Sequence, residues 1–158
     1  MARLKYKLFE DNKEIDTKFG KIIVSTENTI CFPQGIIGFP SCHHYCFTEV
    51  PDNKLPGARI LHSLEDEKLS FIVLPLAPLF YTGDKGLIKF DDVVSGLESY
   101  HIREENLSLV VIAKLIRIDG KLRFSINLKA PLFVDVHEKT AYQHIFIKND
   151  YPISYILV

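Results

Sequence analysis

Apolar and polar residues alternate along most of this chain, and a period of two is typical of β-strands that bury one face. In residues 4–8, Leu4, Tyr6 and Leu8 face one way and the intervening lysines face the other. Turn-forming residues interrupt the alternation at intervals of roughly ten positions. The pattern therefore predicts a series of short strands, at residues 4–8, 21–25, 29–32, 45–50, 59–64, 69–74, 107–118, 121–128, 132–136, 141–147 and 153–157.

The clearest pairing signal lies between the strands predicted at 107–118 and 121–128. They are separated by Asp119-Gly120, a dipeptide that favours the type I′ turn of a β-hairpin. The second strand places its apolar residues on a single face; these are Leu122, Phe124, Ile126 and Leu128. This segment therefore predicts an antiparallel hairpin.

One segment has the spacing of a helix. Asp91 is a candidate N-cap, and Val93, Leu97 and Tyr100 recur at helical intervals behind it. Gly96 disfavours this helix by about 1 kcal/mol relative to alanine. Many short strands with one short helix indicate an all-β fold, a mostly antiparallel and closed or partly closed β-barrel.

The composition is that of one globular domain. The chain has 158 residues, of which 47% are hydrophobic and 25% charged, and its net charge is −1. This balance argues against direct binding of nucleic acid, which requires a clustered basic surface. We find no run of the ~20 apolar residues that a membrane helix needs, and no signal-peptide pattern. Three cysteines do not make a disulfide framework, and we expect a protein of the reducing cytoplasm.

An apolar octet, residues 32–39, stands out because its backbone and its side chains conflict. Pro33 argues against a central strand, and Gly35 and Gly38 permit sharp turns. A loop with this backbone is normally polar, yet it carries four large apolar side chains: Phe32, Ile36, Ile37 and Phe39. We expect the two phenylalanines to plug the core. In a tight turn Ile36 and Ile37 do not both point inward, so one of them is the candidate for an exposed contact.

Four further segments accompany the octet. They are Phe19-Gly20, residues 61–66 with the sequence Leu-His-Ser-Leu-Glu-Asp, residues 127–132 with the sequence Asn-Leu-Lys-Ala-Pro-Leu, and Gln143. In this order the five segments resemble the bacterial flagellar assembly factor FliW family, over roughly residues 17–157. None is specific alone, but five in register over most of the chain are. Residues 1–16 would then be an N-terminal extension packed on a FliW-like barrel domain at 17–158.

The resemblance implies a regulator without an active site. FliW-like proteins bind flagellin and the translational regulator CsrA, an RNA-binding protein that represses flagellin translation. The two partners compete for FliW, so free FliW antagonises CsrA when flagellin is depleted. The resemblance therefore implies a cytoplasmic, non-enzymatic binding protein with no cofactor, no direct contact with nucleic acid and no membrane partner.

Each candidate contact has a structural alternative. The acidic run Glu65-Asp66-Glu67 is either a solvated turn or a surface that meets a basic partner and repels RNA from it. In the segment that contains Asn127, Ala130 and Pro131, the asparagine amide is expected to bond to the backbone of the following turn. We expect Gln143 to do the same inside the barrel.

The sequence also contains residues that could suggest a metal site or an active site. Residues 42–46, Cys-His-His-Tyr-Cys, contain zinc-binding atoms, but strand alternation separates them and no second pair completes a tetrahedron, although His62 could approach. We therefore assign no metal site. The single histidines His62, His101 and His137 match no catalytic motif. The remaining alternative is a small-ligand carrier barrel, which requires an internal cavity of some hundreds of cubic ångströms.

Overall fold

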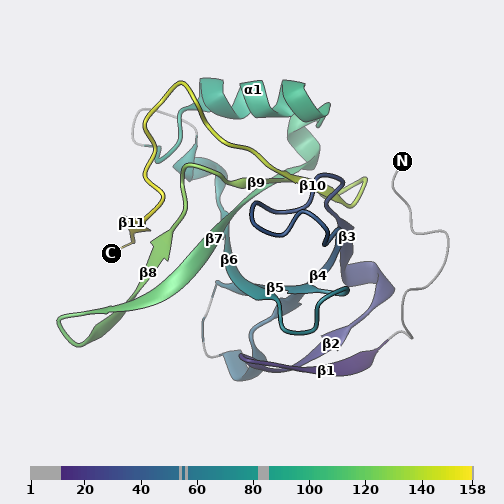
Figure 1. Cartoon of the computed structure of the whole chain (residues 1–158). Helices are drawn as coiled ribbons and strands as arrows, with labels where there is room; N and C mark the ends of the chain where they lie inside the picture. Colours follow the sequence, from purple (N-terminus) through teal and green to yellow (C-terminus); the bar gives the residue numbers. More distant parts are fainter. Residues whose placement is uncertain (1–11, 54, 56, 82–85, 158) are drawn as a thin grey trace.

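Two sheets and one α-helix make up the described part of the chain (Figure 1). The computed structural model describes residues 12–53, 55, 57–81 and 86–157. The helix α1 spans Phe90–Tyr100. The strands are β1 (Lys13–Thr17), β2 (Gly20–Val24), β3 (Thr29–Cys31), β4 (His44–Glu49), β5 (Arg59–Ser63), β6 (Ser70–Leu76), β7 (Leu107–Ile118), β8 (Lys121–Ile126), β9 (Leu132–Asp135), β10 (Thr140–Gln143) and β11 (Tyr155–Ile156). Short 3₁₀ turns lie at Thr26–Asn28, Pro51–Asn53, Pro78–Phe80 and Glu104–Asn106.

The larger sheet closes on itself through β7. The order of hydrogen-bonded neighbours is β7-β6-β5-β4-β3-β10-β9, and β9 pairs again with the first part of β7. All of these pairings are antiparallel except β3 with β10, where Cys31 lies opposite Thr140. The prediction of a mostly antiparallel, closed or partly closed barrel with one short helix is confirmed.

The strands bury both faces, and two clusters of side chains result. One cluster fills part of the barrel interior, with Phe32, Tyr45, Leu61 and Leu132 fully buried in it. The other lies on the outside of the barrel, where α1, the β1–β2 hairpin and the C-terminal segment cover it. Alternate residues of one strand thus enter different cores: Tyr45 points inward, and Cys46 belongs to the outer cluster.

The predicted hairpin is present, and its second half leaves the body of the protein. Asp119 and Gly120 both have positive φ, 50° and 78°, as a type I′ turn requires. Beyond Ala113, where its pairing with β6 ends, β7 is paired with β8 alone. We call this two-stranded projection, residues 114–125, the arm (Figure 1). Burial along the predicted apolar face therefore fades toward the tip, from the fully buried Ile126 to Leu122, which is 53% exposed.

The helix differs from its prediction at the N-terminus. It begins at Phe90, its N-cap is Lys89 and not Asp91, and no side chain caps it. Asp92, in the first turn of the helix, accepts hydrogen bonds from the Tyr151 hydroxyl (2.5 Å) and the Asn149 amide (2.7 Å). These bonds tie the C-terminal segment to the helix. The predicted helix itself is confirmed.

Gly96 is explained by packing. A Cβ at this position would lie 2.3 Å from the ring of the buried Phe133. Glycine therefore allows the helix to approach the barrel at β9, which offsets its poor helix propensity.

The first and last parts of the chain differ from the predicted strands. The strand predicted at 4–8 lies outside the described residues, as do residues 1–11 of the predicted extension. Residues Lys13–Thr17 form β1, which the pattern did not predict. The strand predicted at 141–147 ends at Gln143. The N–H groups of His144 and Phe146 still donate to Pro131 O (3.0 Å) and Lys129 O (2.9 Å), but the return bonds of the ladder are missing, because Pro131 has no N–H and the Lys129 N–H donates to Pro152 O.

Candidate functional site

The octet forms a tight loop that plugs one end of the barrel and exposes part of itself. Phe32 is fully buried against Tyr45, with ring centroids 5.1 Å apart, and Ile36 is 2% exposed. Ile37 is 57% exposed. Phe39 was expected in the core, but it is 38% exposed and packs edge-to-face with Phe71, with ring centroids 5.7 Å apart. The loop thus presents Ile37 and Phe39, and Ile36 is not available to a partner.

Backbone geometry explains this division. The Phe39 N–H donates to Ile36 O at 2.7 Å, which closes a turn between these residues. Gly35 and Gly38 have φ of +71° and +91°, values that other residues rarely adopt. At Gly35 a Cβ would also lie 2.9 Å from the Pro40 Cα. The chain therefore folds back on itself between these two glycines.

Gln143 joins the octet to the second sequence motif. Its Oε1 accepts the Ile37 N–H at 2.8 Å, and its Nε2 donates to Ala130 O at 3.1 Å. Asn127 Oδ1 in turn accepts the Ala130 N–H at 3.1 Å, which is the amide-to-turn bond expected from the sequence. Three segments that are far apart in the sequence are thus held in one hydrogen-bonded chain, and the backbone of Ile37 is fixed at its end.

The acidic turn lies at the same end of the barrel. Glu65 Oε1 accepts the backbone N–H groups of His43 (2.5 Å) and His44 (2.6 Å), where the chain returns from the octet to β4. Ser63 Oγ accepts the N–H groups of Glu65 and Asp66. Glu65 therefore braces the loop. Asp66 and Glu67 are exposed, and Asp66 Oδ1 accepts the Lys68 N–H at 3.0 Å within the turn.

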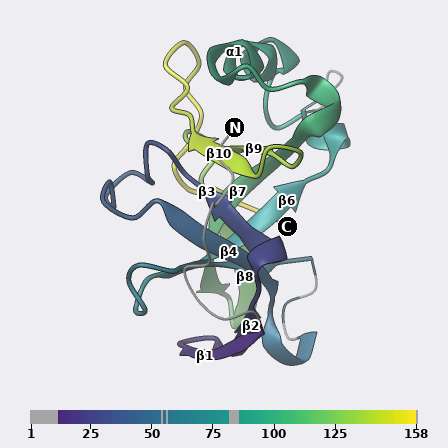
Figure 2. The same ribbon diagram turned by 90° about the vertical axis from the view of Figure 1, so that its right-hand side faces the viewer.

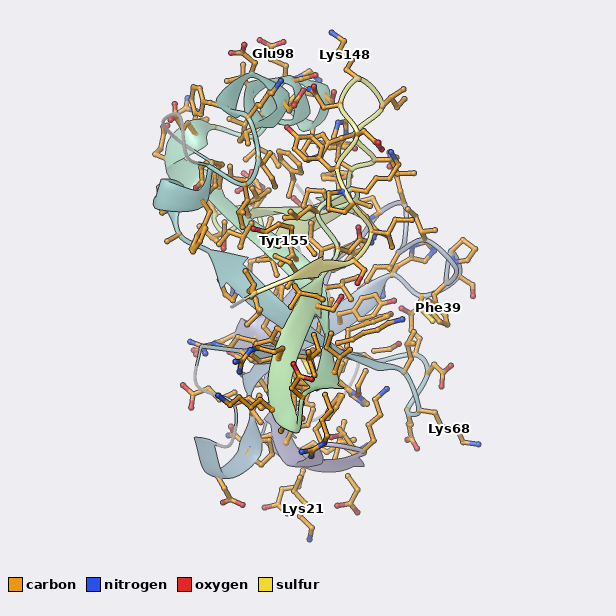
Figure 3. The ribbon with its side chains drawn as sticks, turned by 90° about the vertical axis from the view of Figure 1, so that its left-hand side faces the viewer. Lys21, Phe39, Lys68, Glu98, Lys148 and Tyr155 are labelled. Atoms are coloured by element: carbon orange, nitrogen blue, oxygen red, sulfur yellow. The ribbon has the colours of Figure 1, made fainter. Side chains whose placement is uncertain are left out.

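We call the exposed group Ile37, Phe39, Asp66 and Glu67 the mouth surface. Figure 2 shows the octet loop and the acidic turn projecting from the same side of the barrel, and in Figure 3 the labelled residues Phe39 and Lys68 lie at one edge. The sequence did not predict Phe39 as an exposed contact residue. It did not predict Ile145 or Ile147 either, which are exposed just beyond Gln143. The alternation of these isoleucines with the buried Phe146 was the available signal.

The cysteines and histidines of the octet region do not assemble into a ligand set. Across the described ranges, no group of three or more Cys, His, Asp or Glu side chains is placed to hold a metal ion. Cys46 and His62 face each other across β4 and β5. Burial raises the pKa of Cys46 to about 11 and lowers that of His62, and the His62 ring bonds to the Ser70 hydroxyl. Both side chains are therefore neutral and buried in the outer core.

The other single histidines lie near the surface. His101 ends α1 in a left-handed conformation, and His137 follows β9. Both line a polar recess that also contains Arg103, Asp135 and Glu138. Asp135 Oδ1 accepts the N–H groups of His137 and Glu138, so it stabilises the turn after β9. The residues that line this recess include no serine, cysteine or lysine.

A second recess opens at the opposite end of the barrel. Glu49 and Arg59 are the residues of β4 and β5 farthest from the mouth surface, and both line it. Its volume is about 470 Å³, and its lining includes Phe47, Val110 and Val134. The barrel interior is thus packed at the octet end and hollowed at the other.

Fold and site together define a β-barrel protein whose candidate functional feature is a braced, exposed loop surface. The sequence profile described as FliW protein matches residues 13–157, nearly the whole chain. The chain therefore belongs to the FliW family. The match begins at residue 13 and so includes β1.

Named relatives and a solved structure agree. The chain is 29% identical to the flagellar assembly factor FliW of Clostridium kluyveri over 146 residues, which cover 91% of this chain and 94% of that protein. It is 30% identical to the protein of the same name from Caldicellulosiruptor bescii over 139 residues, covering 88% and 86%. A crystal structure of the flagellar assembly factor FliW superposes with a TM-score of 0.67 at 24% identity, over 91% of this chain and 96% of that one. The low identity makes this last match evidence of the fold.

The described residues contain no helix that is both long and apolar enough to cross a membrane.

Proposed function

We propose that this chain is a cytoplasmic flagellar assembly factor that acts by binding flagellin and a CsrA-type translational regulator, and that the mouth surface contacts the regulator. Membership of the FliW family supports the first part. The observation that carries the second is the exposed Ile37, whose backbone is held by Gln143. A loop whose backbone is fixed before binding loses little conformational entropy when a partner covers it.

The charges of the mouth surface suit a regulator that binds RNA. Such proteins carry basic surfaces. The turn that contains Asp66 and Glu67 projects from the same side of the barrel as the octet loop with Ile37 and Phe39. Acidic groups at the rim of an interface accelerate association with a basic partner and repel competing phosphates. The apolar pair supplies the area buried from water. In this scheme flagellin releases the regulator from this chain, because the two compete for binding to it.

The test is to titrate the purified chain with the CsrA-type regulator and with flagellin of the source organism, separately and together. Ile37→Asp places a charge where the bound regulator covers an apolar side chain. We therefore expect at least a tenfold loss in affinity for the regulator, the equivalent of about 1.4 kcal/mol. Ile23→Asp is the matched control, because Ile23 is 55% exposed on β2. Its affinity should be that of the unmodified chain.

Two outcomes would reject the proposal. If neither protein binds at micromolar concentration, the partners are wrong. If both bind but the Ile37 and Ile23 variants behave alike, the partners stand and the mouth surface is not the contact.

The recess at the opposite end favours a second candidate function, the binding of a small ligand. Its lining combines apolar side chains with Glu49 and Arg59, which is the composition of a ligand pocket, and its volume is about 470 Å³. A fluorescent amphipathic dye such as anilinonaphthalene sulfonate tests it. One equivalent bound, and lost in a Ser108→Phe variant that fills the recess, would support the carrier. The absence of saturable dye binding would leave the regulatory function alone.

A further inference from the structure

The arm carries a concentration of positive charge. It contains four cations, Lys114, Arg117, Lys121 and Arg123, against the single carboxylate of Asp119, a net charge of +3 in a chain whose total is −1. Where the structure describes the chain, none of these four cations forms an ion pair. The arginines donate only to carbonyls of the arm itself.

The register of the arm sorts its side chains onto two faces. Residues opposite each other in an antiparallel pair point to the same side. One side combines Ile118 with Lys121, Ile116 with Arg123, and Lys114 with Ile156 of β11 through Ser125. Each row across this side therefore contains one isoleucine and one cation. We call these six residues the basic face of the arm.

The exposure of this face has no structural explanation within the barrel. Ile118 and Ile156 are among the exposed large apolar residues, and Ile116 is half-buried. A two-stranded ribbon that leaves the body of a protein gains little stability by itself, and exposed apolar groups in a cluster mark an interaction site. Figure 3 looks along the arm toward the body, with Tyr155 of β11 near its base.

We propose that the basic face of the arm docks an acidic, amphipathic segment of a partner protein. The cations require a partner with carboxylates, and the isoleucines require apolar side chains between them. The five residue pairs from Lys114–Ser125 to Ile118–Lys121 extend over roughly 16 Å, which matches about three turns of a helix. Single-stranded RNA is disfavoured, since base stacking uses aromatic side chains and these six residues include none.

This surface is separate from the mouth surface. Figure 1 shows the arm leaving the barrel away from the acidic turn between β5 and β6, and Figure 2 shows the octet loop projecting to a different side. The two surfaces also have opposite charge. The inference therefore does not depend on the partners proposed above, and it adds a second, chemically distinct contact to this fold.

The test uses a fluorescent amphipathic helical peptide, about three turns long, with glutamates on one face and leucines on the other. It is titrated with the full chain at low salt. Its counterparts are the same peptide with lysine for glutamate, and an oligouridine RNA. We expect the acidic peptide to bind, and raised salt to weaken it. Backbone amide shifts on binding should be confined to the arm and β11.

The arm variant carries Lys114→Glu, Lys121→Glu and Arg123→Glu. Its matched control carries Lys13→Glu, Lys21→Glu and Lys148→Glu, exposed lysines elsewhere, with the same change in net charge. We expect the arm variant to lose about tenfold or more in affinity for the acidic peptide and the control to lose less than threefold. If the arm variant does not fold, the glutamine substitutions at the same three positions serve instead.

The proposal is overturned if the acidic peptide does not bind the unmodified chain, if the two variants lose affinity equally, or if the lysine peptide binds as well. It is also overturned in favour of nucleic acid if oligouridine binds more tightly than the peptide and only the arm variant loses it. Failure of the mouth-surface variants to affect regulator binding leaves this result unchanged.

Discussion

The double hydrogen bond of Gln143 makes the most direct prediction about how the mouth surface is held. In a Gln143→Leu variant, a side chain of similar size replaces the amide and both bonds are lost, to the Ile37 N–H and to Ala130 O. The Ile37 N–H is near solvent, where water replaces much of the lost bond. Ala130 is buried, so its carbonyl loses its partner in a poorly hydrated place, which is the larger cost.

We estimate the combined loss at about 2 kcal/mol of unfolding free energy, with the larger share from the Ala130 carbonyl. This corresponds to roughly a 30-fold change in the ratio of folded to unfolded protein. Urea denaturation measures it as a lower midpoint with an unchanged slope. Hydrogen exchange gives a local measure, because the Ile37 amide should exchange at least about five times faster once its acceptor is removed.

Gln34→Leu is the control. Gln34 lies in the same loop, is exposed and makes no hydrogen bond with any part of the chain that the structure describes. Its stability should stay within about 0.5 kcal/mol of the unmodified chain. Equal stability of the two variants, together with unchanged exchange at Ile37, would refute the view that Gln143 fixes the loop.

Three further predictions concern other parts of the fold. Gly96→Ala should destabilise the protein by about 1–3 kcal/mol in thermal unfolding despite its better helix propensity, because the new Cβ meets the Phe133 ring; adding Phe133→Leu should recover part of the loss, and a stabilised single variant would contradict the packing. Glu65→Gln should cost about 1–2 kcal/mol by removing a charged acceptor of two backbone amides, whereas Glu67→Gln should be neutral; equal effects would show that Glu65 is no brace. Burial lowers the pKa of His62 and of His144 below 6.5, so the unfolded chain takes up protons that the native one does not, and stability should fall as the pH drops through about 6.5; a His62→Leu variant should show a shallower slope, and an identical slope would exclude His62 as a source.

Local signals carried most of the strand and hairpin predictions. Asp119-Gly120 specifies its turn through backbone conformations that few residues adopt, and alternation located β3 to β9 closely. The closure of the ring was predicted only as a class of fold. Its specific pairings, β7 with β9 and β3 with β10, join residues far apart in the chain, and alternation does not identify which strands meet.

The candidate site shows the same limit at the level of single residues. Ile36 and Ile37 are chemically identical, and the turn between Gly35 and Gly38 sets which one is exposed. The bond that holds this turn comes from Gln143, 106 positions away. Phe39 looked like a core residue because aromatic side chains usually are, but the turn from Ile36 directs it outward. The sequence shows that Glu65 is acidic, but it does not show that the backbone N–H groups of His43 and His44 donate to it. Alternation likewise marked the apolar residues of β8 without showing that the strand leaves the barrel.

The parallel pairing of β3 with β10 also sets an order of events in synthesis. Cys31 is made early and Thr140 late, so the ring stays open until nearly the whole chain has emerged from the ribosome. Until then β3 keeps an unsatisfied edge, a template for pairing with other chains. Bringing such distant segments together slows folding. A nascent chain of this kind is vulnerable during translation and should gain most from a chaperone that covers the open edge.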